Sequence, residues 1–186
     1  MLQIYTNNQI DEIAFELKNN KCIVLPTDTV WGVVSLDDSL IYKIKKRKKS
    51  KKLVKFVNNL FQINNLDKNY IQILDKYLPG ALTFVFKKQA YRIPNNDLIL
   101  DLINQVGPLF SSSANISGKT PINNLQEAID VFGKYSNVVC FVDDNEQQAG
   151  FSALPSTIVD LDRMIILRQG VIDGNKILQE IDQARR

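Results

Sequence analysis

Four short segments of this 186-residue sequence place hydroxyl, amide or cationic side chains beside an apolar stretch. They are residues 26–32 (PTDTVWG), 45–47 (KKR), 113–118 (SANISG) and 156–160 (STIVD). Lysine and arginine neutralise phosphate oxygens, and arginine does so through two parallel hydrogen bonds. Serine, threonine and asparagine offer neutral donors and acceptors to a small ligand. Together the segments suit a site for a polyphosphate and a small polar acid.

The chain contains no histidine and only two cysteines, which narrows the possible chemistry. Mechanisms that need imidazole as base, nucleophile or metal ligand are excluded. A structural zinc site is not expected either, because such sites use several cysteines or histidines. Clamping by cations, hydrogen bonding by hydroxyls and amides, and a magnesium ion carried by a phosphate substrate remain.

The cysteines themselves predict the compartment. Cys22 and Cys140 each lie within an apolar run, so we expect two buried, reduced thiols in a cytoplasmic protein. Residues 1–20 lack a cationic start followed by an apolar core, so no signal peptide is expected. No apolar run approaches the length of about 18 residues that spans a bilayer, so no membrane association is expected.

Residues 43–52 contain eight lysines and arginines, and three interpretations of this basic run stay open. It could be the solvated end of a helix and its loop, or a patch that grips RNA phosphates. In the third interpretation, two or three of the cations clamp a triphosphate and the rest attract it. Arg47 is then the best anchor, because guanidinium binds phosphate oxygens in a bidentate manner.

Alternating helices and strands must position these segments. Helical spacing of apolar residues predicts helices over 10–17, about 40–45, 70–77, 98–105, 125–132 and from about 175. Apolar runs predict strands over 22–26, 82–86, 138–142, 157–161 and 164–168. Thr6 with Gln9, and Asn124 with Glu127, predict helix-capping boxes. The pattern predicts one α/β or α+β domain over residues 1–186.

In their order and spacing, the segments resemble the YrdC family of threonylcarbamoyl-AMP synthases over nearly the entire chain. The family's first motif corresponds to residues 26–32, with Trp31 where tyrosine is usual, and its Lys-x-Arg corresponds to Lys45 and Arg47. Its Pro-Gly-Pro-Leu-Thr, Arg-x-Pro, Ser-Ala-Asn-x-Ser-Gly, Ser-Thr-Ile-Val-Asp and Leu-Arg-x-Gly motifs begin at Pro79, Arg92, Ser113, Ser156 and Leu167. The resemblance implies a twisted, open mixed sheet flanked by helices, with a basic concave face.

The resemblance also implies an activity. Members of the family make threonylcarbamoyl-AMP from L-threonine, bicarbonate and ATP and release pyrophosphate. The product is used to form threonylcarbamoyl-adenosine in tRNA, so tRNA would be an indirect partner through downstream machinery. Magnesium would arrive with ATP, and no organic cofactor is expected.

The resemblance carries site residues over by position. ATP would be bound by Lys45, Arg47, Lys51, Ser113, Asn115 and Arg168, and threonine by Thr29, Arg92, Ser111 and Ser156. Four of the ATP residues would be catalytic: Lys45, Arg47, Ser113 and Asn115. Because two anions must react, cations and positioning supply the catalysis, without a covalent protein nucleophile. The sequence departs from the family where Phe56 replaces a histidine near the threonine, and where Ala81 replaces the second proline of the turn.

Two other functions stay open at this point. The first is an RNA-binding module that uses residues 43–52, although that run has no interleaved aromatic residues to stack bases and the net charge is only +3. The second is a paralogue of the same fold that acts on another carbamoyl or adenylate substrate, because the phosphate clamp would be shared.

Overall fold

A computed structural model describes residues 3–136, 138–143 and 154–185 of the protein. The strands are β1 (Gln3–Thr6), β2 (Cys22–Leu25), β3 (Gly32–Ser35), β4 (Val54–Phe56), β5 (Leu82–Phe86), β6 (Gln89–Arg92), β7 (Leu109–Ser113), β8 (Val138–Asp143), β9 (Thr157–Asp160) and β10 (Ile165–Arg168). The helices are α1 (Ile10–Lys18), α2 (Asp38–Ile44), α3 (Lys68–Leu74), α4 (Asp97–Val106), α5 (Leu125–Phe132) and α6 (Gly174–Ala184), with a 3₁₀ turn at Leu60–Gln62.

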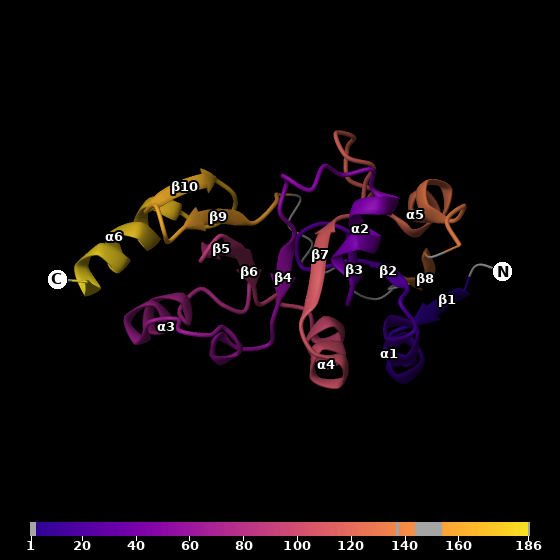
Figure 1. The fold of residues 1–186 in the computed structure, drawn as a ribbon, viewed down its shortest axis with the longest axis horizontal. Coiled ribbons are helices and arrows are strands. Elements are labelled where there is room, and N and C mark those ends of the chain that lie inside the picture. Colours follow the sequence, from indigo (N-terminus) through magenta and orange to yellow (C-terminus); the bar gives the residue numbers. More distant parts are fainter. Residues whose placement is uncertain (1–2, 137, 144–153, 186) are drawn as a thin grey trace.

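The described strands form one mixed sheet in the order β1-β8-β2-β3-β7-β4-β6-β5-β9-β10 (Figure 1). The pairs β1–β8, β8–β2, β4–β6 and β5–β9 are parallel, and the other neighbours are antiparallel. The predicted open mixed sheet flanked by helices is therefore confirmed. Within the described ranges, no helix is long and apolar enough to cross a membrane.

The predicted helices are all present, with ends shifted by a few residues. Asn124 caps α5 by accepting a hydrogen bond from Glu127 N (2.9 Å), and Glu127 Oε2 accepts one from Asn123 N (2.8 Å). At α1 the predicted capping box is only partly formed. The Gln9 side chain accepts from Thr6 N (3.1 Å), but Gln9 itself is the N-cap and makes no side-chain capping bond.

Five strands, β1, β3, β4, β6 and β7, were not among the strands predicted from sequence. They are three to five residues long, and β7 consists of two apolar residues followed by three serines. β3, β4, β6 and β7 become strands because they pair with a neighbour on each side, and β1 because it pairs with β8 at the edge of the sheet; local propensity does not reveal such pairing. The serines of β7 are thus central sheet residues and not a turn.

Alternation along the strands assigns side chains to two faces of the sheet. Val34 and Leu109 pack with α1 and α4, whereas Val33 and Phe110 face α2 and α5. The register places Leu109 opposite Phe56 and Phe56 opposite Arg92, so these three side chains lie on one face of the sheet. The same face continues across the next strands to Thr83 on β5 and Arg168 on β10. We call this the site face.

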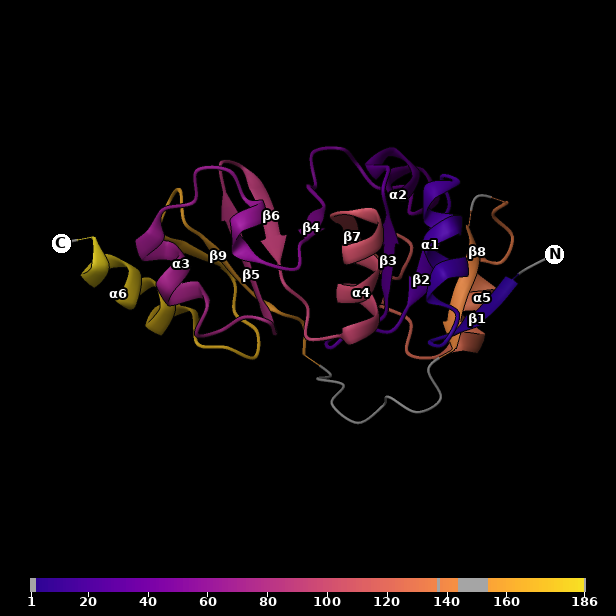
Figure 2. The same cartoon turned by 90° about the horizontal axis from the view of Figure 1, so that it is seen from below.

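The helices leave part of the site face uncovered. Over β5 and β9, helices α3 and α6 pack against Leu82, Phe84 and Val159, which the register places on the face opposite to Thr83. Figure 2 shows α3 and α6 at this end of the sheet. Thr83 and Ile158, the residues of β5 and β9 on the site face, belong to none of the hydrophobic clusters that the helices form with the sheet. Because neighbouring strands are rotated by about 20–25° relative to one another, the site face points in different directions at the two ends of the sheet.

Candidate active site

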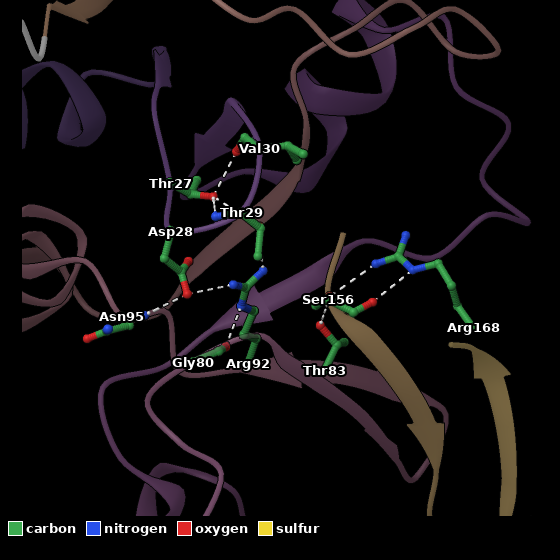
Figure 3. A network of polar contacts seen from close by, with 10 residues as sticks. All are labelled: Thr27, Asp28, Thr29, Val30, Gly80, Thr83, Arg92, Asn95, Ser156 and Arg168. Carbon is green, nitrogen blue, oxygen red and sulfur yellow. Dashed lines mark hydrogen bonds and ion pairs between the residues drawn. The ribbon is translucent and has the colours of Figure 1, made fainter. Parts of the chain in front are cut away.

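Arg92, the last residue of β6, is the centre of a buried polar network with Thr27, Asp28, Thr29, Gly80 and Asn95, which we call the arginine network (Figure 3). Its Nε donates to Gly80 O (2.9 Å) and its Nη1 to Thr29 Oγ1 (3.0 Å), while Nη2 lies 2.7 Å from Asp28 Oδ2. Burial lowers the pKa of Arg92, and the Asp28 carboxylate opposes this effect. The guanidinium therefore remains charged although its side chain is only 5% exposed.

The turn before β3 presents Asp28 and Thr29 to Arg92. Thr27 Oγ1 accepts from Thr29 N (3.2 Å) and donates to Val30 O (2.7 Å), which closes the turn through a side chain. Asn95 N donates to Asp28 Oδ2 (3.0 Å) from the segment that follows β6. The threonine–aspartate–threonine pattern thus holds Asp28 in one position.

Two polar atoms of the arginine network lack a hydrogen bond among the described residues. They are Asp28 Oδ1 and Arg92 Nη2; the latter has an ion-pair contact to Oδ2 without a directed hydrogen bond. Both side chains are at least nine-tenths buried. Such atoms are costly unless a partner satisfies them, so the network retains one acceptor without a hydrogen bond beside a guanidinium nitrogen that has only its ion pair.

Ser156, Thr83 and Arg168 form a second group on the site face, the serine–arginine cluster (Figure 3). Arg168 donates from Nε to Ser156 O (2.9 Å) and from Nη2 to Ser156 Oγ (3.0 Å). Ser156 Oγ lies 2.9 Å from Thr83 Oγ1. Burial lowers the pKa of Arg168, and the positive charge of Arg92 lowers it further, so two guanidinium groups act on the same region.

Gly170 explains why the Leu-Arg-x-Gly motif ends in glycine. A Cβ at this position would lie 2.2 Å from Pro155 O and 2.5 Å from Thr157 N, so the backbone around Ser156 packs directly on Gly170. Thr157 Oγ1 accepts from Gly170 N (3.0 Å) and Ile172 N (3.1 Å). These contacts fix the main chain that carries Ser156.

Lys45, Ser113 and Asn115 form the third group, the lysine cluster. Lys45 is 1% exposed, and its Nζ donates to Ser113 O and to Asn115 Oδ1 (2.8 Å). Ser113 Oγ donates to the same Asn115 oxygen (2.8 Å). No carboxylate of the described residues pairs with Lys45, and burial, followed by the charge of Arg47, lowers its pKa to about 7.

Arg47 and Lys51 lie on the loop after α2. Arg47 Nε donates to Lys51 O (2.9 Å) and its Nη2 to Lys52 O (3.0 Å), so the guanidinium holds the basic loop together. Burial lowers the pKa of Arg47. The Lys51 side chain is exposed. Of the eight basic residues in 43–52, only Lys45 is buried.

The structure thus brings together Lys45 with Ser113 and Asn115, Thr29 with Arg92, and Ser156 with Arg168. Ser111 is buried at the centre of β7 on the site face. A Cβ on Gly32 would lie 3.8 Å from Ser111 Oγ and 3.0 Å from Thr27 Cγ2, so the glycine keeps these hydroxyl-bearing residues close to its strand. Phe56 is buried among Ile99, Leu102 and Leu109 in the core below α1 and α4.

Sequence reasoning missed Asp28 and Thr83 as members of these groups. Asp28 stands between the two threonines of the first segment, and Thr83 ends the Pro-Gly turn, so both lay inside motifs that were recognised.

Cys22 is buried as predicted, and burial raises the pKa of its thiol to about 12. The side chain of Cys140 lies outside the described part of the structure.

Fold and site together define an α/β protein with a cationic, hydroxyl-rich site on an open mixed sheet. Residues 16–170 match the family model Sua5_yciO_yrdC, described as "Telomere recombination". The chain therefore belongs to the Sua5/YciO/YrdC family.

Individual relatives agree with this family. A putative threonylcarbamoyl-AMP synthase of Methanocaldococcus jannaschii is 30% identical over 209 residues, which cover 95% of this chain and 96% of the relative. An uncharacterised protein of Mycoplasma pneumoniae is 32% identical over 161 residues, which cover 86% of this chain. The chain spans about a third of that relative (34%) and of its Mycoplasma genitalium counterpart (35%). A solved structure of a Pyrococcus abyssi Sua5 variant aligns with a TM-score of 0.81 and 26% identity, covering 96% of this chain and 63% of that one.

Proposed function

We propose that this protein is a threonylcarbamoyl-AMP synthase, a nucleotidyltransferase that converts L-threonine, bicarbonate and ATP into threonylcarbamoyl-AMP and pyrophosphate. The observation that supports this proposal most directly is that Asp28 Oδ1 and Arg92 Nη2 lack hydrogen bonds, although Nη2 is ion-paired with Asp28 Oδ2. An α-amino acid carries a cationic amino group beside an anionic carboxylate. A small adjustment that opens Asp28 Oδ1 and Arg92 Nη2 to a ligand would offer one partner to each group.

The surrounding hydroxyls support threonine within this class. Thr29, Ser111 and Ser156 are each 2–4% exposed and belong to three separate segments, of which the first bonds Arg92 directly and the other two lie on the site face. A site that binds the substrate hydroxyl through such groups rejects valine, because the isosteric methyl leaves a buried polar group unpaired. Arg92 would pair with the threonine carboxylate, and the three hydroxyls would position the remainder of the amino acid.

The proposed reaction has two steps. The threonine amine adds to bicarbonate with loss of water, forming a carbamate. A carbamate oxygen then attacks the α-phosphorus of ATP, and the bond to the β-phosphate breaks so that pyrophosphate leaves with the electron pair. The cations Lys45, Arg47, Lys51 and Arg168 would neutralise the reacting anions and the leaving group, with Ser113 and Asn115 assisting.

Magnesium belongs to this proposal as part of the nucleotide substrate. Mg²⁺ prefers oxygen ligands and is commonly bound by substrate phosphates together with water. Within the described ranges, no three acidic, cysteine or histidine side chains cluster to hold a metal ion. The residues present fit a metal that ATP carries, and the cationic side chains would meet the phosphate oxygens that magnesium leaves free.

The product would pass to the machinery that modifies tRNA, so tRNA is proposed as an indirect partner and the cytoplasm as the location. An enzyme of this family that acts on another carbamoyl or adenylate substrate is the second candidate, because the lysine cluster would serve any adenylate. An RNA-binding module is less well supported, since the buried hydroxyl and guanidinium groups of the site are unnecessary for binding RNA phosphates.

Pyrophosphate release tests the proposal directly. Purified protein is incubated with ATP, magnesium, bicarbonate and L-threonine, and each component is omitted in turn. We expect release to require all four, and to fall at least 100-fold on Arg47→Ala or Asn115→Ala, as for the loss of a group that stabilises transition-state charge. Lys76→Ala, at an exposed position on the far side of the sheet, is the control. Release that is indifferent to threonine supports the second candidate, and no release together with tight RNA binding supports the third.

A further inference from the structure

Thr83 is a buried hydroxyl on the site face that the proposed roles do not use. It lies on β5, is 1% exposed, and its Oγ1 is 2.9 Å from Ser156 Oγ (Figure 3). Ser156 Oγ also accepts a hydrogen bond from Arg168 Nη2 at 3.0 Å. In the described part of the chain, the Thr83 hydroxyl has no other hydrogen-bond partner.

One hydrogen bond joins the two hydroxyls, so one of their two hydrogens has no protein acceptor, and the bound amino acid can offer an acceptor only to Ser156 in the proposed site. A hydroxyl has one hydrogen and two lone pairs. If Ser156 donated to Thr83, the hydrogen left over would be that of Thr83, which is 1% exposed and contacts no substrate in the proposed reaction, so nothing would offset its cost. If Thr83 donates, Ser156 accepts from both Thr83 and Arg168, and its own hydrogen stays available to a ligand.

We propose that Thr83 is a positioning residue for the amino-acid end of the site. By donating to Ser156, it turns the Ser156 hydroxyl so that Ser156 donates to an oxygen of the bound amino acid. Ser156 then recognises an oxygen acceptor and not a methyl or ammonium group. This inference rests on the proposed function and specifies how that site selects its substrate.

Thr83 can determine only the orientation of the Ser156 hydroxyl, because other contacts hold the Ser156 main chain. The main chain around Ser156 is held independently, by Arg168 Nε on Ser156 O, by the bond from Thr157 N to Ala81 O (3.0 Å) and by the close contact with Gly170. Removing the Thr83 hydroxyl should therefore alter substrate recognition while the fold is retained. Valine is nearly isosteric with threonine, and serine keeps the hydroxyl.

The test measures kcat and KM for threonine and for ATP in Thr83→Val and Thr83→Ser, with L-threonine binding measured by calorimetry. We expect Thr83→Val to raise KM and the dissociation constant for threonine about tenfold, as for loss of one well-oriented hydrogen bond. KM for ATP should change less than twofold. Thr83→Ser should recover most of the threonine affinity, which a purely structural role for the methyl group would not predict.

A double-variant cycle with Ser156→Ala tests whether Thr83 acts through Ser156. In the Ser156→Ala background, Thr83→Val should add no further effect on threonine binding. Additive effects, or unchanged threonine constants in a folded Thr83→Val protein, would overturn the inference while leaving the proposed function intact. If Thr83→Val unfolds, Thr83→Ala serves as the hydroxyl-free variant in the same cycle. Wild-type protein that neither binds nor needs threonine would overturn both proposals.

Discussion

The lysine cluster and the arginine network hold buried cations in opposite ways. Arg92 has a carboxylate 2.7 Å away and two neutral acceptors, whereas Lys45 has only the neutral oxygens of Ser113 and Asn115. A guanidinium stays charged at any physiological pH, but an amine without a counter-ion loses its proton readily when it is buried. The arginine network therefore presents a permanent charge, and the lysine cluster presents a charge that titrates near neutrality.

The largest expected effect comes from breaking the Arg92–Asp28 pair. Arg92→Met leaves the buried Asp28 carboxylate without its counter-ion, which should lower the free energy of unfolding by about 3–5 kcal/mol. Urea denaturation of the variant measures this change. Adding Asp28→Asn to Arg92→Met should restore part of the loss, because the uncompensated charge is then removed.

A matched ion pair on the surface gives the control. Lys76 and Glu180 lie 2.9 Å apart, with side-chain exposures of 59% and 24%. Lys76→Met should cost at most about 1 kcal/mol. A loss at Lys76 as large as that at Arg92 would contradict the view that burial makes the Arg92 pair essential.

Replacing Lys45 by methionine tests the difference between the two buried cations through the pH dependence of the free energy of unfolding. The pKa of Lys45 is lowered from 10.5 to about 7 by burial, so between these values the unfolded chain binds a proton that the folded chain has lost. In that interval the free energy of unfolding of the wild type should rise with pH relative to Lys45→Met. Below about pH 7 both states hold the proton, and the difference between the proteins should be constant.

Chemical denaturation of both proteins across this pH interval measures the effect. Parallel pH profiles for the wild type and Lys45→Met would show that the amine keeps an ordinary pKa. Lys45→Met should also lower pyrophosphate release about 100-fold, because the site loses a cation that would neutralise the reacting anions.

The smallest effect is expected at Arg47, whose guanidinium bonds two carbonyls of the basic loop. In Arg47→Lys, one ammonium replaces the two nitrogens that reach Lys51 O and Lys52 O, so about 1 kcal/mol of stability should be lost. Limited proteolysis should also cleave the loop faster. Lys49→Ala, at an exposed position in the same loop, should leave both measurements unchanged.

Much of the fold could be predicted because it depends on local signals. The amphipathic spacing of α1, α4 and α6 and the apolar runs of β2, β5 and β9 are properties of consecutive residues. The serines of β7 carry no such signal. They became strand residues because β3 and β4 pair with them on either side, and pairing partners distant in sequence are invisible to local patterns.

The candidate site likewise depends partly on local sequence and partly on contacts between distant segments. The sequence alone identified the hydroxyl, amide and cationic segments, because residue type and spacing determine which chemistry is available. Only the tertiary structure decided that Asp28 is the counter-ion of Arg92, that Thr83 contacts Ser156, and that Lys45 is the buried one of the eight basic residues in 43–52. The physical reason is that burial and charge pairing depend on distances between segments far apart in the chain, which the folded sheet sets.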